Sequence, residues 1–218
     1  MSKEELYALI EEMNDNTPYS NSDDSISWNA HRKAEKISDP TVFLIIREII
    51  EENDHKKSVE KRNVRYAAYF IGGKLLQRIF DYNFCKFYIQ RLRVESNKYV
   101  LSSMLDRLSE LDIVDDLNIE PILDCTKSEK WLIRDSAIRA LGSFNTIKSR
   151  ECLRAFVGLD DEKKNEYVII YAQGALGRIG EKEDIELLQM HVNSRKRDIK
   201  MSACFAQERL KEKYNVER

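Results

Sequence analysis

Residues 133–142 read IRDSAIRALG, and residues 168–177 read VIIYAQGALG in the same register. Counted from the first residue of each stretch as position 0, apolar or small residues recur at positions 0, 3, 4, 7, 8 and 11. At about 100° per residue these positions share one face of an α-helix. The small residues at positions 4 and 7 allow a neighbouring helix to approach closely, and the glycine at position 9 relaxes or ends the helix. We therefore expect Ala137 and Ala172 to be buried between helices.

The same pattern recurs along the chain. Four further copies begin at residues 26, 64, 100 and 199, so that successive copies start 31 to 38 residues apart. Another apolar-periodic stretch precedes each copy, and these six stretches are 6–13, 42–50, 84–92, 119–125, 152–157 and 185–192. The sequence therefore predicts six pairs of helices. Because one pair cannot bury its apolar face alone, the pairs must stack on one another.

The segment Arg134–Phe144 resembles the second helix of a HEAT repeat, of the short subtype also seen in phycobilisome-lyase-type proteins, and Val168–Gly180 is similarly close. The resemblance implies an all-α fold, a right-handed α–α superhelix of about six antiparallel helix pairs with the second helices lining its concave side. It implies a single solenoid over residues 1–218, with a divergent helix pair at 1–38. HEAT arrays mostly bind other macromolecules, so the motif is informative about fold and nearly silent about function.

Composition agrees with a helical, water-exposed protein. Only 3 prolines and 7 glycines occur among 218 residues, which suits long helices joined by short turns. The formal net charge of −2 argues against a protein that binds nucleic acid through its overall charge. No apolar run reaches the length of a membrane span, and the acidic N-terminal segment is unlike a signal peptide. We expect a cytoplasmic protein that does not enter membranes.

No residue pattern predicts an active site. The chain lacks the nucleophile-elbow, phosphate-loop and zinc-protease motifs, and it lacks the His-Glu dipeptides of iron-binding HEAT hydroxylases. The glycine-rich run Gly72–Lys74 falls inside a predicted helix. The cysteines are far apart and no histidine lies beside them, which indicates reduced thiols rather than a metal site. We expect no catalytic residue, metal or cofactor. The cysteines are Cys85, Cys125, Cys152 and Cys204.

A second, enzymatic reading comes from another group of HEAT-like proteins. The alkylpurine DNA glycosylases use a HEAT-like solenoid with aromatic and acidic residues on a basic concave face. This chain has the residue types but not the basic charge that such a face requires. The residues are Trp28, Trp131, Arg134, Asp135 and Arg139.

The favoured reading is a scaffold that binds a protein partner on the concave face. Positions 2, 5, 6 and 9 of the second helices lie on the side of the helical wheel that points away from the packing face. They are unusually apolar for a face in water, which is typical of partner sites. Alternatively, first helices, loops or tight curvature of the array cover these positions. The sequence identifies neither the partner nor the oligomeric state. The candidate binding residues are Tyr66, Tyr69, Arg139, Ile170, Met201 and Phe205.

Two polar loops interrupt the repeats. Residues 14–24 have strong turn chemistry, and Asp23 or Asp24 is expected to cap the helix that follows. Residues 53–61 form a second, charged loop. Long loops within repeats carry function in some proteins and are tolerated insertions in others.

Overall fold

The computed structural model describes residues 1–54 and 58–216, and nearly all of the regular structure in these ranges is helical. Within the described ranges the helices follow one another as six pairs, so the predicted order of first and second helices is confirmed. None of the described helices has both the length and the apolarity needed to cross a membrane. The pairs are α1 (Lys3–Met13) with α2 (Ile26–Ala34), α3 (Val42–Glu52) with α4 (Val59–Arg78), α5 (Tyr82–Arg91) with α6 (Lys98–Ser109), α7 (Glu120–Thr126) with α8 (Trp131–Leu141), α9 (Ile147–Val157) with α10 (Glu162–Ile179), and α11 (Asp184–Gln189) with α12 (Arg197–Tyr214).

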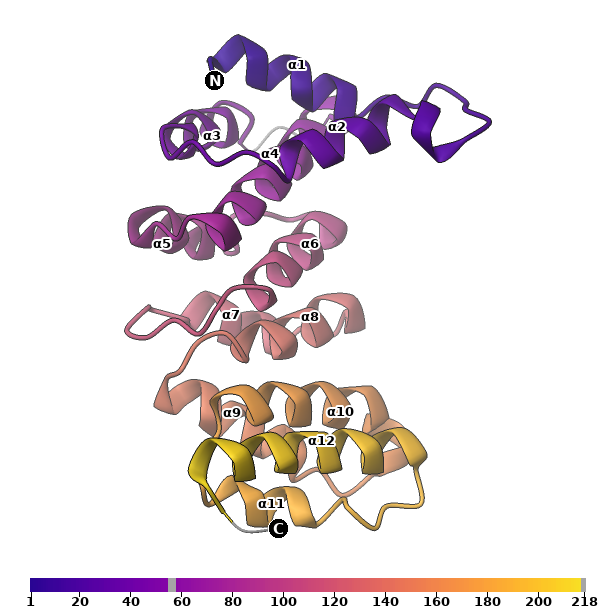
Figure 1. Cartoon of the computed structure of the whole chain (residues 1–218), viewed down its shortest axis with the longest axis vertical. Coiled ribbons are helices and arrows are strands. Elements are labelled where there is room, and N and C mark those ends of the chain that lie inside the picture. Colours follow the sequence, from indigo (N-terminus) through magenta and orange to yellow (C-terminus); the bar gives the residue numbers. More distant parts are fainter. Residues whose placement is uncertain (55–57, 217–218) are drawn as a thin grey trace. The chain divides into compact units, whose positions relative to one another are not determined.

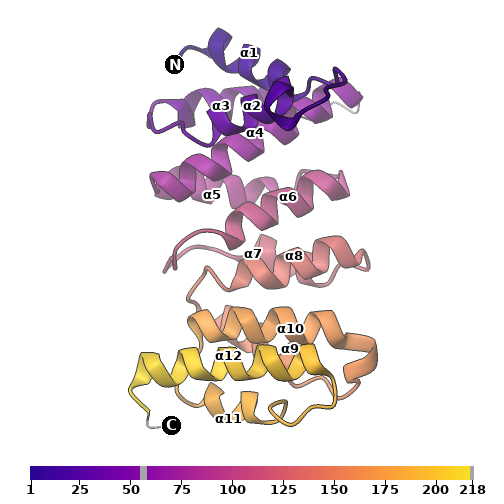
Figure 2. The same ribbon diagram turned by 45° about the vertical axis from the view of Figure 1, so that its right-hand side comes forward.

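The chain divides into two compact units, Met1–Arg107 and Leu108–Arg218. In the first unit α1 packs on α2, and α3 packs on α4 (Figure 1). In the second unit α10 packs against α8, α9 and α12, and α11 packs against α12 (Figure 2). A single solenoid over residues 1–218 stays a prediction. The loop predicted at 53–61 begins after α3, but its residues 55–57 lie outside the described ranges, and α4 already starts at Val59.

Short polar side chains cap the starts of the first two α-helices. Ser2 and Glu5 form a reciprocal capping box at the start of α1. The cap of α2 is Ser25, whose Oγ accepts a hydrogen bond from the backbone N–H of Trp28 at 3.1 Å. The prediction that Asp23 or Asp24 caps this helix is therefore wrong. Both aspartates lie in a short 3-10 helix, η1 (Ser22–Asp24), which delays the start of α2 and leaves Ser25 in the extended capping conformation.

The second helices of the second unit contact one another through glycine and alanine. A Cβ placed on Gly142 would lie 2.9 Å from the Cα of Ala175, and one on Gly177 would lie 2.8 Å from the Cα of Ala206. In both contacts, position 9 of one helix meets position 7 of the next. Gly142 ends α8 as expected, but Gly177 lies inside α10, where it permits close packing instead of ending the helix.

The predicted core positions are buried. Ala137 and Ala172, both at position 4, have no exposed surface, which confirms the register of the repeats. In the first unit the run Gly72–Lys74 lies inside α4, as predicted. Arg65 of the same helix forms a buried ion pair with Glu95, with 2.8 Å from Arg65 Nε to Glu95 Oε2. Polar and apolar contacts together therefore fix α4 in its unit.

Candidate binding surfaces of the second helices

Four of the six predicted binding residues lie on second helices of the second unit. Arg139, Met201 and Phe205 are exposed, and Ile170 is half-buried. The Oγ of Ser202 donates a hydrogen bond to the carbonyl oxygen of Ile170 at 3.1 Å, so this turn of α12 lies against α10. Met201 and Phe205 therefore stand on the helix that packs directly against the helix of Ile170.

Tyr66 and Tyr69 belong to α4 in the first unit, and they differ in exposure. Tyr66 is 38% exposed, whereas Tyr69 is only 1% exposed. The hydroxyl of Tyr88 donates to the carbonyl oxygen of Tyr69 at 3.0 Å, and the two rings meet edge to face at 5.5 Å. Burial raises the pKa of Tyr69 to about 12. The prediction of Tyr69 as an exposed binding residue is therefore wrong.

The reason is the position of Tyr69 in the repeat. Position 5 of α4, at the edge of the outward side of the helical wheel, faces α5 of the next helix pair rather than solvent. Ile138 and Gln173 occupy the same position in α8 and α10, and both are fully buried. Position 6 is different, because Arg139 and Phe205 at that position are exposed. The open face of a second helix is therefore centred near position 6.

Two tyrosines that the sequence analysis missed extend this open face. Tyr167 and Tyr171 stack along α10 with 6.4 Å between ring centroids, and the guanidinium of Arg139 lies 5.2 Å from the ring of Tyr171. Tyr167 is at position −1, which is next to position 6 on the helical wheel. Extending the wheel one residue upstream would therefore have placed Tyr167 on the open face. Tyr171 is at position 3, which the repeat pattern places on the packing face, and it is only half-buried. We call the following residues the second-helix surface: Arg139, Tyr167, Ile170, Tyr171, Met201 and Phe205.

One edge of this surface is a groove of about 410 Å³ between α8 and α10. Its two most exposed aromatic walls are Trp131 and Tyr167, which are 66% and 67% exposed. The backbone of α10 leaves helical geometry at Asn165, with φ −110° and ψ 16°, so groove residues come from both sides of a kink. We call this feature the Trp131 groove. It is lined by Trp131, Arg134, Asp135, Lys164, Asn165, Tyr167, Val168 and Tyr171.

The groove contains one shielded carboxylate among several cations. The Asp135 side chain is 10% exposed, and the Nε of Arg134 donates to its Oδ1 at 3.3 Å. Burial raises the pKa of Asp135 above its ordinary value, although the positive charges of Arg134 and Arg139 oppose the shift. Lys164 is exposed at the same groove. The groove thus offers aromatic walls, a surplus of positive charge and a carboxylate acceptor.

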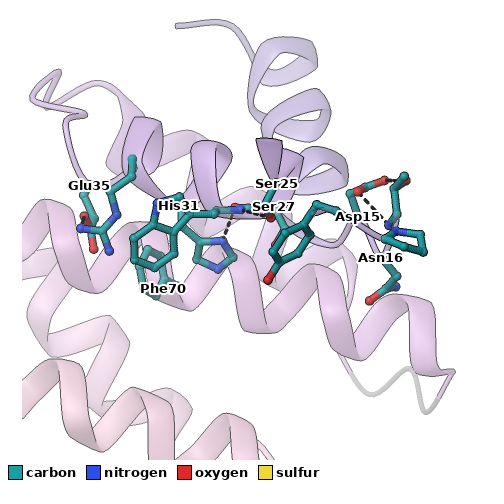
Figure 3. Close-up of a pocket in the computed structure, with 12 residues that line it drawn as sticks. Asp15, Asn16, Ser25, Ser27, His31, Glu35 and Phe70 are labelled. Atoms are coloured by element: carbon teal, nitrogen blue, oxygen red, sulfur yellow. Dashed lines mark hydrogen bonds and ion pairs between the residues drawn. The ribbon is translucent and has the colours of Figure 1, made fainter. Parts of the chain in front are cut away.

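A second concave feature lies in the first unit, between the polar loop 14–24 and α2. This loop pocket has a volume of about 540 Å³. Figure 3 shows His31 and Phe70 on its helix side, with Asp15 and Asn16 from the loop on the opposite side. The Nδ1 of His31 donates to the carbonyl oxygen of Ser27 at 2.7 Å, and its ring contacts Phe70 edge to face at 5.0 Å.

The most exposed aromatic ring of α2 also lines the loop pocket. The guanidinium of Arg32 lies 4.4 Å from the ring centroid of Trp28, and it forms an ion pair with Glu35 at 2.8 Å. Within this pocket the positive charge of Arg32 is therefore balanced by the Glu35 carboxylate, and its guanidinium also contacts the indole ring of Trp28. The structure places Trp28 here, in the first unit, whereas Trp131, Arg134, Asp135 and Arg139 lie together in the second.

Comparison with known proteins agrees with the repeat geometry. Residues 119–206 match the family model for HEAT repeats. The chain contains HEAT-like repeats over residues 119–206. An engineered protein from a structural-genomics consortium has a TM-score of 0.54 at 15% sequence identity, over 97% of this chain and 98% of its own. A designed armadillo repeat protein has a TM-score of 0.52 at 15% identity, over 94% and 99%. No curated protein matches the chain.

These similarities show the fold alone, which is all-α and of the α–α superhelix class. The described residues contain no group of three or more His, Cys, Asp or Glu side chains placed to hold a metal ion. Burial raises the pKa of the Cys85 thiol to about 12 and that of Cys125 to about 11. Both thiols are therefore protonated at neutral pH and are weak nucleophiles.

Proposed function

We propose that this HEAT-like repeat protein is a non-enzymatic scaffold that binds a protein partner on its second-helix surface. The observation that carries the proposal is the exposure of aromatic and apolar side chains on adjacent second helices of the second unit. Tyr167, Met201 and Phe205 are all exposed there. Exposed apolar side chains grouped on one surface are typical of sites that bind another protein.

The chemistry of the surface also suits a protein partner. Tyrosine, methionine and arginine are enriched in the centres of protein interfaces, and aromatic residues contribute much of the binding energy. Burying one large apolar side chain contributes about 1.5–3 kcal/mol. Association costs about 4–15 kcal/mol. Several side chains of the second-helix surface must therefore be covered together. Tyr66 is the corresponding candidate in the first unit.

The test begins by capturing binding proteins from the native host, purifying the most enriched one and measuring its affinity directly. The double variant Ile170→Ala with Phe205→Ala should bind at least about tenfold more weakly, which is about 1.4 kcal/mol. The matched control removes two exposed side chains of first helices, Leu44→Ala with Tyr82→Ala. The control should bind like the natural protein. An unchanged affinity for the Ile170 and Phe205 variant, with helix content intact, would place the site elsewhere, and the loop pocket would be tested next.

A second candidate function, nucleic-acid binding of the alkylpurine DNA glycosylase type, has one observation in its favour. The Trp131 groove brings Trp131, Arg134 and Asp135 together, with Arg139 close by at Tyr171. The net charge of −2 argues against it, because phosphate contacts need a basic surplus. A labelled DNA duplex decides between the two. Binding that weakens steeply with salt, together with release of alkylated bases, would favour the nucleic-acid function over the scaffold.

A further inference from the structure

We infer that the Trp131 groove takes an aromatic side chain, tryptophan or tyrosine, from an acidic segment of the partner protein. This inference rests on the proposed function and specifies the chemistry of the partner. It requires a groove shaped for a planar ring, cations that meet the acidic residues, and an acceptor for the N–H or O–H of the ring. Each of these is present in the second unit.

The walls of the groove suit a planar ring. Trp131 and Tyr167 expose about two thirds of their surface, and Tyr171 and Val168 also line the groove. Aromatic rings attract one another in offset-stacked or edge-to-face arrangements. The kink at Asn165 allows Lys164, before it, and Tyr167, after it, to line the same groove. An aromatic side chain of the partner would therefore be in contact with rings and have a cation beside it.

The positive charge of the Trp131 groove favours an acidic segment of the partner protein. Arg134, Arg139 and Lys164 bring three positive charges to the groove and its edge, against the single carboxylate of Asp135. Lys164 forms no ion pair with any residue that the structure describes, so its charge is available to a partner. Complementary charges across an interface speed association and exclude wrong partners. A basic segment would meet the three cations and be repelled.

Asp135 distinguishes among aromatic side chains. Its Oδ1 accepts from Arg134, whereas its Oδ2 accepts from no described residue. A shielded carboxylate oxygen beside an aromatic groove is an acceptor for an indole N–H or a phenol O–H. Tryptophan and tyrosine can donate this bond, and phenylalanine cannot. The same carboxylate disfavours the phosphates of a nucleic acid, and the neighbouring Ile170, Met201 and Phe205 offer aliphatic and aromatic surface suited to protein.

The experiment measures fluorescence anisotropy with the full chain and four labelled probes at physiological salt. The first probe is a short peptide that alternates glutamate with tryptophan. In the second, lysine replaces each glutamate, and in the third, alanine replaces each tryptophan. The fourth is a single-stranded oligothymidine of similar length. We expect the first peptide to bind at least about tenfold more tightly than the other three probes.

Two variants locate the binding. Trp131→Ala with Lys164→Glu should weaken binding of the first peptide at least about tenfold. The matched control is Tyr99→Ala with Lys98→Glu, which removes an exposed aromatic ring and the lysine 4.9 Å from its centroid in the first unit. The control should leave the affinity unchanged. If the groove variant loses helix content, Lys164→Glu alone replaces it, since that side chain is exposed.

Four results would overturn the inference. They are a lysine peptide that binds as tightly as the first peptide, an alanine peptide that does so, an oligothymidine that binds more tightly, and a groove variant that binds as well as its control. A different result would refute the proposed function. If the peptide test fails while the Ile170 and Phe205 variant still loses the captured partner, the scaffold function stands and only the choice of an acidic aromatic segment is wrong.

Discussion

Two glycines of α10 test the packing of the second unit, because they differ in what a methyl group would meet. A Cβ on Gly177 would lie 2.8 Å from the Cα of Ala206, which is 0.6 Å closer than the 3.4 Å at which ordinary contact begins. A Cβ on Gly174 would meet nothing within 4 Å. Because Ala206 presents backbone at this contact, α12 itself has to shift to relieve the clash at Gly177.

The expected effects follow from two opposing terms. Replacing glycine by alanine inside a helix stabilises by about 0.5–1 kcal/mol. Overpacking a close contact costs about 1–3 kcal/mol. Gly174→Ala has only the first term and should stabilise the protein. Gly177→Ala has both terms and should destabilise it by about 1 kcal/mol net. Since the helix term is common to both variants, their difference measures the clash alone.

Urea denaturation followed by circular dichroism measures both variants under the same conditions. In thermal melts, a difference of about 1 kcal/mol corresponds to about 2–4 °C for a chain of this size. If Gly177→Ala is as stable as Gly174→Ala, α10 and α12 are not in backbone contact there. The regular contact of position 9 with position 7 would then be wrong as well.

Three further predictions concern buried and charged groups. Ala172→Glu should unfold or strongly destabilise the protein, because it places a carboxylate where no surface is exposed, and an unchanged melting temperature would refute the repeat register. Arg65→Met should cost about 3–5 kcal/mol in urea denaturation by stranding the Glu95 carboxylate, which is 2% exposed, and adding Glu95→Leu should recover part of that loss. Hydrogen bonds, that from Ser194 first, hold the pKa of Glu162 below its ordinary value of 4.5. The stability that the ionised Glu162 carboxylate contributes to the fold is therefore complete above that pH and is lost as pH falls through the lower folded-state pKa. Glu162→Gln should reduce the acid-induced fall in stability. An identical acid titration of both proteins would contradict this assignment.

Much of the fold was predictable because its causes are local and periodic. Small residues at position 4 of five copies, with Met104 in the sixth, and apolar residues around them predicted six helix pairs, and Ala137 and Ala172 are buried as that pattern requires. Such patterns are readable because a helix turns by a fixed angle per residue, so spacing alone determines which residues share a face. The position of the cap of α2 was harder. Ser25 and the two preceding aspartates are all good capping residues, and the turn geometry of η1 decides among them.

The candidate site was only partly predictable, because exposure depends on which neighbouring helix covers each face. The sequence placed Tyr66 and Tyr69 on the same open face, but Tyr88 of α5 packs over Tyr69 and leaves Tyr66 exposed. The Trp131 groove combines side chains of α8 and α10 that are 29 to 40 residues apart, and a kink at Asn165 shapes its edge. A helical wheel describes one helix at a time. The groove exists because α8 and α10 pack side by side, so only the tertiary structure brings Trp131 and Tyr167 together.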